Sequence, residues 1–145
     1  MPLPADVEAK FPGLVDGYEQ TSPEDPAYNC IAHAAGDHEA WWDPARQPNV
    51  YWPLRAPRNY SLAALEAAFG TLGYTRCATE ELEDGLEKIA IFVNEVQEFA
   101  HAARQLEDGS WTSKIGRNED IRHRLRQLEG AEYGTAAAFL ARPRR

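Results

Sequence analysis

Apolar residues recur at helical spacing in the middle of the chain and form short continuous runs toward its end. Between Ser61, a capping residue, and Gly73, a stop signal, the apolar side chains repeat every three to four positions and predict an amphipathic helix. The run 88–93 is continuous and rich in β-branched residues, as in a buried strand. Asp108-Gly109 separates the segments 99–106 and 111–115, which predicts a β-hairpin.

The remaining segments alternate between helical patterns, loops and one further strand. The predicted helices cover residues 5–10, the segment from Cys30 to about Gly36, and residues 119–128. Prolines mark loops at 21–26 and over the long stretch 41–59, and residues 133–140 read as a closing strand. Helices come mainly before strands, which is the order of an α+β domain rather than of repeated βαβ units.

Length and charge limit the classes of function. The 145 residues predict a single domain over 1–145. Fifteen Lys and Arg stand against 23 Asp and Glu, a net charge of -8, which argues against a nucleic-acid partner because phosphates require basic surface. The chain lacks a signal-peptide pattern and an apolar run of about 18 residues, so we expect no membrane association and a cytoplasmic location with both cysteines reduced.

Cys30 is the candidate nucleophile. Turn-forming residues precede it and an Ala-rich helical segment follows, so the positive end of the helix dipole is expected to lower the pKa of its thiol. His101 lies far along the chain, on the first strand of the predicted hairpin. A cysteine at a helix start combined with a distant strand histidine is the pattern of a cysteine hydrolase.

The residue that would orient His101 follows from the hairpin register. A tight turn at Asp108-Gly109 places Gln105 opposite Thr112, and then no carboxylate shares the face of His101. Asp120, just beyond the second strand, is the nearest acid and the expected orienting residue. Its alternatives are the two residues before it, Asn118 and Glu119.

Three stretches, Tyr28–Ala34, Lys88–Phe92 and His101–Gly116, resemble a small uncharacterised bacterial family, and the resemblance covers most of the chain. The order of cysteine, histidine and a later polar residue is similar to the papain-like superfamily, including cell-wall endopeptidases, transglutaminase-like proteins and deamidase toxins. This resemblance implies a papain-like α+β fold, with helices packed on a small antiparallel sheet, and a thiol-hydrolase mechanism.

In that mechanism Cys30 attacks a carbonyl or amide carbon and His101 accepts the thiol proton. The backbone N–H of Cys30 and the side chain of Asn29 are the expected oxyanion donors. A protein or peptide-like substrate is expected, with peptidase, amidase and deamidase as open alternatives. The residues expected to line its groove are the aromatic side chains of the long loop, Trp41, Trp42 and Trp52.

Two other readings of the same residues lead to different functions. A non-catalytic papain-like module would use the aromatic loop to dock a partner protein. A metal centre is not expected, because the spacing of His33, Cys30, His38 and Asp37 matches no zinc signature. No cofactor is expected either.

Overall fold

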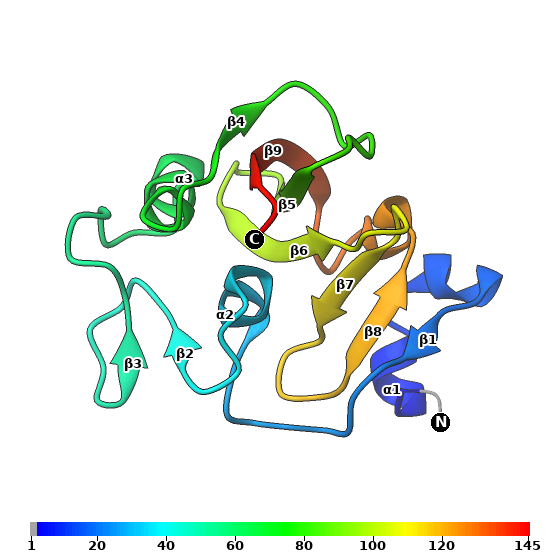
Figure 1. Ribbon diagram of the computed structural model, residues 1–145. Helices are drawn as coiled ribbons and strands as arrows, with labels where there is room; N and C mark the ends of the chain where they lie inside the picture. Colours follow the sequence, from blue (N-terminus) through cyan, green and yellow to red (C-terminus); the bar gives the residue numbers. More distant parts are fainter. Residues whose placement is uncertain (1–2) are drawn as a thin grey trace.

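A seven-stranded antiparallel sheet is the main element of the computed structural model, which describes residues 3–145 (Figure 1). Its strand order is β1-β8-β7-β6-β5-β9-β4. The strands are β1 (Glu19–Gln20), β4 (Thr75–Cys77), β5 (Leu86–Val93), β6 (Phe99–Gln105), β7 (Trp111–Lys114), β8 (Asp120–His123) and β9 (Thr135–Pro143). A separate parallel pair is formed by β2 (Trp41–Trp42) and β3 (Val50–Tyr51).

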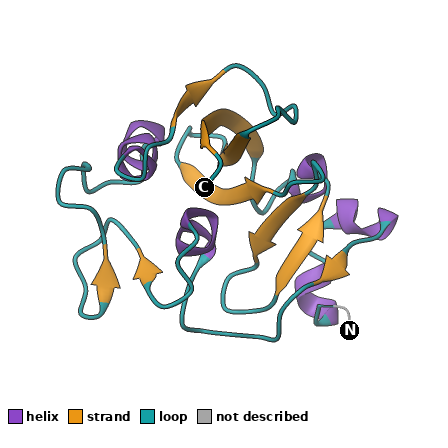
Figure 2. Ribbon diagram, in the orientation of Figure 1, coloured by secondary structure: helices purple, strands orange, loops and turns teal. Residues whose placement is uncertain are grey.

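Short helices surround this sheet (Figure 2). They are α1 (Ala5–Glu8), η1 (Pro12–Asp16), α2 (Cys30–Ala35), α3 (Leu62–Gly70) and η2 (Leu125–Leu128). Helix α2 packs on β6 and β7. None of the helices between residues 3 and 145 has the length and apolar character needed to cross a membrane. Because short helices pack on an antiparallel sheet, the predicted α+β class is confirmed. The papain-like fold stays a prediction.

Both faces of the central strands are buried, which explains the continuous apolar run at 88–93. Ile89 and Ile91 join the apolar cluster beneath α2 and α3, whereas Ala90 and Phe92 join a second cluster on the other face. A strand covered on both faces cannot show the alternation of a half-exposed strand. The predicted strand is confirmed, and β5 begins two residues earlier than expected.

The predicted helices are confirmed at three places and wrong at one. Helix α3 begins after Ser61, whose Oγ accepts a hydrogen bond from the Ala64 N–H at 3.1 Å. Helices α1 and α2 also form where expected. Residues 119–128 instead form strand β8 followed by η2, because β8 pairs along β7 as the next hairpin arm. The alternation of β8 and the three-residue turn of η2 together imitate a helical spacing at Ile121, Leu125 and Leu128.

The hairpin between β6 and β7 exists, but its register differs by one residue from the prediction. Gln105 pairs with Trp111 and Arg104 with Thr112. The Leu106 N–H donates to the Ser110 carbonyl at 2.7 Å, and Gly109 has φ +91. The tip is therefore a three-residue loop whose last glycine takes a positive φ. This extra residue moves every side chain of β7 to the opposite face relative to β6.

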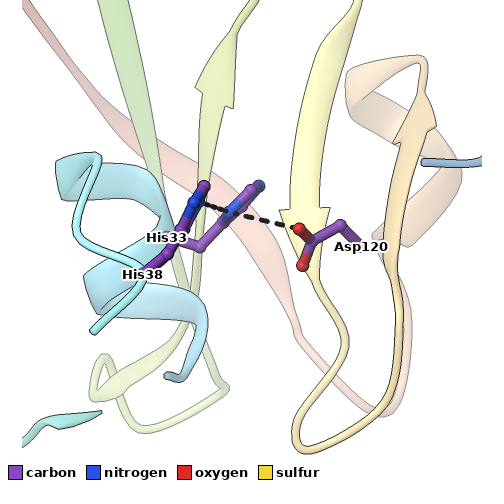
Figure 3. A group of neighbouring side chains, drawn as sticks. All are labelled: His33, His38 and Asp120. Atoms are coloured by element: carbon purple, nitrogen blue, oxygen red, sulfur yellow. Dashed lines mark hydrogen bonds and ion pairs between the residues drawn. The ribbon is translucent and has the colours of Figure 1, made fainter. Parts of the chain in front are cut away.

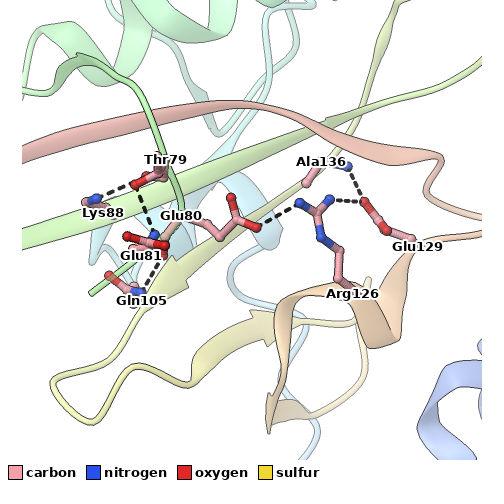
Figure 4. A network of polar contacts seen from close by, with 8 residues as sticks. All are labelled: Thr79, Glu80, Glu81, Lys88, Gln105, Arg126, Glu129 and Ala136. Carbon is pink, nitrogen blue, oxygen red and sulfur yellow. Dashed lines mark hydrogen bonds and ion pairs between the residues drawn. The ribbon is translucent and has the colours of Figure 1, made fainter. Parts of the chain in front are cut away.

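A polar network joins the β4–β5 connection to β6, η2 and β9 (Figure 4). The Glu80 carbonyl accepts from Gln105 Nε2 at 2.9 Å, and its carboxylate accepts from Arg126 Nη2 at 2.8 Å. Arg126 also donates to Glu129, whose carboxylate accepts from the Ala136 N–H at 3.0 Å. Hydrogen bonds from its own backbone and from Arg126 lower the pKa of Glu80. The network fixes η2 against the sheet.

We expect Gly134→Ala to destabilise the fold by about 2–4 kcal/mol, which corresponds to a fall in Tm of roughly 5–10 °C. Gly134 has φ +70, and a Cβ there would clash with the Val93 carbonyl oxygen. Thermal unfolding followed by circular dichroism measures the change. Gly70→Ala is the matched control, because it lies in α3 with open space around it and should leave Tm unchanged or slightly higher.

Candidate functional site

Cys30 is the first residue of α2, as predicted, and lies partly buried against β6. Its predecessor Asn29 caps the helix, with the side-chain oxygen accepting from the Ala32 N–H at 3.1 Å. The backbone N–H of Ala102, the residue after His101, is among the groups that favour the Cys30 thiolate. Cys30 packs against the apolar cluster that contains Ala102, whereas the His101 ring contacts Phe92 of the cluster on the other face of the sheet. No hydrogen bond joins the Cys30 thiol to the imidazole within residues 3–145.

The expected lowering of the Cys30 pKa is wrong. Burial raises the pKa of this thiol from 9.0 to about 11, although backbone N–H groups of Ala102, Ile31 and Cys30 act in the opposite direction. Helix α2 has only six residues, so its dipole is small compared with the cost of placing a thiolate in a partly apolar site. At neutral pH the resting form of Cys30 is therefore the thiol.

His101 lies at one end of a buried hydrogen-bonded relay that includes Ser113 and His123. His101 Nε2 is 2.9 Å from Ser113 Oγ, which is 2.7 Å from His123 Nε2. His123 Nδ1 is 2.7 Å from the carbonyl oxygen of Arg124. Burial lowers the pKa of His123 to about 4 and lowers that of His101 well below 6.5, and the charges of His123 and His33 lower the pKa of His101 further. Both rings are therefore neutral at pH 7.

The relay fixes the tautomer of each neutral ring. A carbonyl oxygen only accepts hydrogen bonds, so His123 carries its proton on Nδ1 and accepts through Nε2. Ser113 then donates to His123, and its oxygen accepts from His101 Nε2–H. This leaves the lone pair on His101 Nδ1, a buried atom that has no hydrogen-bond partner within the described chain. A buried nitrogen without a partner is unusual and is available as a base.

Tyr133 covers the relay histidine. Its ring stacks on His101 with centroids 4.0 Å apart and planes within 4° of parallel. Burial raises the pKa of Tyr133, and the charges of Cys30 and Glu132 contribute to the same increase. Tyr133 lies between Gly130 and Gly134, whose backbones hydrogen-bond to each other in both directions. A hollow of about 270 Å³ adjoins this loop, lined by Asn94, Glu95, Val96, Gly130, Ala131 and Gly134.

The side chain of Asn29 is committed to local structure, which argues against the predicted oxyanion role. Its oxygen accepts from the backbone N–H groups of Ala32 and Trp42, at 3.1 and 3.2 Å. Its nitrogen donates to the Trp42 carbonyl at 2.6 Å. Asn29 therefore fastens the start of α2 to strand β2, within the segment that was expected to be irregular.

Two of the three tryptophans predicted to line a substrate groove belong to the core. Trp42 and Trp52 are both 4% exposed and lie in the apolar cluster beneath α2 and α3. Their indole N–H groups donate to Asp37 at 2.9 Å and to the Pro57 carbonyl at 3.1 Å. Trp41 is partly exposed, with the Arg117 guanidinium 5.4 Å from its ring centroid. The groove prediction therefore finds no support at Trp42 and Trp52.

Asp120 accompanies His33 instead of His101. Asp120 pairs with Lys114 in the β7–β8 register, which places it on the face opposite Ser113. Its Oδ2 accepts from the Tyr28 hydroxyl at 2.7 Å and lies 3.7 Å from His33 Nδ1. Burial lowers the pKa of His33 to about 4, although the charge of Asp120 raises it. The predicted role of Asp120 in orienting His101 has no geometric support.

Comparison with known proteins places the chain in a family. Residues 19–141 match the sequence profile of DUF7689, described as a domain of unknown function. The chain belongs to this family. Searches of curated proteins and of solved structures gave no match. The DUF7689 region contains Cys30, the complete His101 relay and the His33–Asp120 contact.

Two relay residues of this DUF7689 chain were not predicted from the sequence. Ser113 was missed because the one-residue error in register turned it away from His101, and Thr112 took its place. His123 was missed because it lay within a predicted helix. A signal was nevertheless present: His123 and Ile121 alternate with Arg122, as buried and exposed positions of a strand do.

Proposed function

We propose that the chain is a thiol hydrolase with a papain-like fold, in which Cys30 is the nucleophile and His101 the general base. The observation that carries this proposal is the Nδ1 atom of His101, which has no hydrogen-bond partner among residues 3–145 and whose lone pair is fixed by the relay through Ser113 and His123. In this arrangement Ser113 orients the imidazole, the role that a carboxylate or amide has in other triads.

The raised pKa of Cys30 determines how the first step proceeds. The thiol transfers its proton to His101 Nδ1 as its sulfur forms a bond to the substrate carbonyl carbon. The protonated imidazole then donates this proton to the leaving amine or ammonia, and water hydrolyses the thioester. Backbone N–H groups of Ala102, Ile31 and Cys30 favour the thiolate and are the donors available for the oxyanion.

The substrate class remains that of a peptide or amide bond in a protein or peptide-like molecule, with peptidase, amidase and deamidase activity as the alternatives. Such a substrate approaches through the Tyr133 loop, since the Tyr133 ring covers His101 and a hollow adjoins the loop. The mechanism requires Cys30 as a free thiol, as it is in this structure. The proposal therefore includes a reducing compartment such as the cytoplasm.

Acylation of Cys30 tests the proposal without knowledge of the natural substrate. We expect p-nitrophenyl acetate to leave one acetyl group on the wild-type protein at pH 7.5, detected by intact-protein mass spectrometry after rapid acid quenching. Peptide mapping should place this group on Cys30, because the proposal assigns His101 as the base that takes the proton of this thiol. Cys77→Ala is the matched control, since it removes the other free cysteine and should leave the acetylation unchanged.

Two results would contradict the proposal. One is acetylation at Cys77 or on lysines with Cys30 unmodified. The other is an equal rate of Cys30 acetylation in the His101→Gln variant, which would show that the imidazole is not the base.

The alternative of a binding module has a different basis from the one predicted. Trp42 and Trp52 are buried, but Leu54 is 94% exposed and Tyr51 and Tyr60 are partly exposed on the same long segment. These side chains are the available docking contacts. A binding module would retain partner binding in Cys30→Ala and lose it in Leu54→Asp. A hydrolase would lose acylation in Cys30→Ala and retain it in Leu54→Asp.

A further inference from the structure

Two histidines and one aspartate converge on the face of the sheet that is covered by α2 (Figure 3). His33 comes from α2, His38 from the turn that follows it, and Asp120 from the start of β8. One ligand atom of each residue lies within 4.8 Å of the others. His33 Nδ1 is 2.9 Å from His38 Nε2 and 3.7 Å from Asp120 Oδ2. We call these three residues the His33 cluster.

Neighbouring residues hold this cluster in position. Helix α2 ends at Gly36 in the left-handed conformation, which turns the chain so that the His38 ring stacks on that of His33. His33 Nε2 is 2.9 Å from Thr112 Oγ1, and the Tyr28 hydroxyl donates to Asp120 Oδ2 at 2.7 Å. Metal-binding histidines usually have such a partner on the second ring nitrogen, which leaves the first nitrogen free to coordinate.

Asp120 has an oxygen that the described protein leaves without a partner. Asp120 is 5% exposed, and its Oδ1 forms no hydrogen bond within residues 3–145. Lys114 lies nearby, but its ammonium group is placed over the Tyr28 ring, 4.2 Å from the centroid, and makes no ion pair with Asp120 in the described chain. A buried carboxylate oxygen without a donor indicates a missing ligand such as a cation.

We propose that His33, His38 and Asp120 bind one divalent transition-metal ion, with Zn²⁺ as the best-matched ion. Two imidazoles and a carboxylate are a common donor set for Zn²⁺, whereas Ca²⁺ and Mg²⁺ prefer oxygen ligands only. Zinc bonds of about 2.0–2.2 Å in a tetrahedron separate neighbouring ligand atoms by about 3.3 Å. The two observed separations, 2.9 and 3.7 Å, lie on either side of this value.

The geometry also leaves a coordination position open. Three protein ligands are one fewer than a closed structural zinc site requires, so a water molecule or substrate atom completes the tetrahedron. His38 is exposed whereas His33 and Asp120 are buried, so the ion enters from the side of His38. The site is separate from the His101 relay, because Thr112 and Ser113 point to opposite faces of β7.

Isothermal titration of the tag-free full chain with Zn²⁺ tests this proposal. We expect one ion per chain, and at least tenfold weaker binding in His38→Ala, a variant that should fold because His38 is exposed. Co²⁺ should give the visible absorption of a tetrahedral nitrogen and oxygen site in the wild type and lose it in His38→Ala. Glu39→Gln is the matched control, because it removes an adjacent exposed acid outside the cluster and should bind Zn²⁺ as the wild type does.

Cys30→Ala separates this site from the proposed thiol chemistry. Its Zn²⁺ affinity should equal that of the wild type, since Cys30 is not part of the His33 cluster. The metal site would be overturned by the absence of stoichiometric Zn²⁺ binding, by unchanged affinity in His38→Ala, or by loss of binding in Cys30→Ala. None of these results bears on acylation of Cys30 measured with a metal chelator present.

Discussion

The free energy of unfolding should be about 6 kcal/mol lower at pH 5 than at pH 7.5, because His101, His123 and His33 are buried as neutral rings. Their folded-state pKa values are lowered, that of His123 to about 4, whereas the unfolded chain titrates near the ordinary 6.5. Between these values the unfolded state binds more protons than the folded state. The stabilisation is therefore complete above pH 6.5 and is lost as the pH falls toward 4.

Urea denaturation at a series of pH values, with a chelator present, measures this dependence. His123→Gln removes one of the three titrating rings, so the loss between pH 7.5 and pH 5 should fall to about two thirds, roughly 4 kcal/mol. This variant has lower stability at pH 7.5, but the slope against pH is the decisive quantity. If the wild type and His123→Gln lose the same stability over this interval, the relay histidines are not the groups that titrate.

Local signals in the sequence predicted the local structure well. The Ser61 cap, the helix after it and the apolar strand at 88–93 all form as expected, because each depends on residues that are close in sequence. The position of Cys30 at the start of α2 was also predictable from residues that are close in sequence. Its preceding residue Asn29 acts as the cap, and Gly36 ends the helix.

The composition of the site depends on one turn whose type the sequence left open. Asp108-Gly109 fits both a two-residue turn and a three-residue loop with a glycine at positive φ, and these differ by one residue of register. The structure has the longer loop, so Ser113 and not Thr112 meets His101. A single step in register thus changed the predicted third residue from a distant acid to a serine on the neighbouring strand.

Residue spacing in the sequence could not predict the His33 cluster, for a different reason. His33 and Thr112 are 79 positions apart and meet only because α2 packs across β6 and β7. Asp37 is the acid adjacent to these histidines in the sequence, but it accepts a hydrogen bond from the Trp42 indole. Asp120, at the start of the neighbouring strand β8, takes its place beside His33.

The rate at which p-nitrophenyl acetate acylates Cys30 should fall about 1000-fold at pH 7.5 when His101 is replaced by Gln. Burial raises the pKa of Cys30 to about 11, so at pH 7.5 very few molecules carry a thiolate and the reaction depends on a base. Gln cannot accept the thiol proton, although its size is similar. Stopped-flow release of p-nitrophenol measures the rate, and mass spectrometry confirms the modified residue.

The pH dependence of this rate distinguishes a lost base from a disturbed fold. In His101→Gln the rate should increase about tenfold per pH unit up to about pH 10, because hydroxide then supplies the thiolate that the imidazole no longer assists. The wild type should show a much weaker dependence above pH 7, so the two rates converge as the pH approaches the pKa of Cys30. Ser113→Ala is the matched variant, because it keeps the base but removes the hydrogen bond that fixes the tautomer of His101. We expect an intermediate loss in rate of about 10- to 100-fold. The imidazole ¹⁵N shifts of His101 should then report a mixture of the two tautomers. A constant ratio between wild type and His101→Gln from pH 7 to pH 10 would mean that His101 supports the structure of the site without accepting the proton of Cys30.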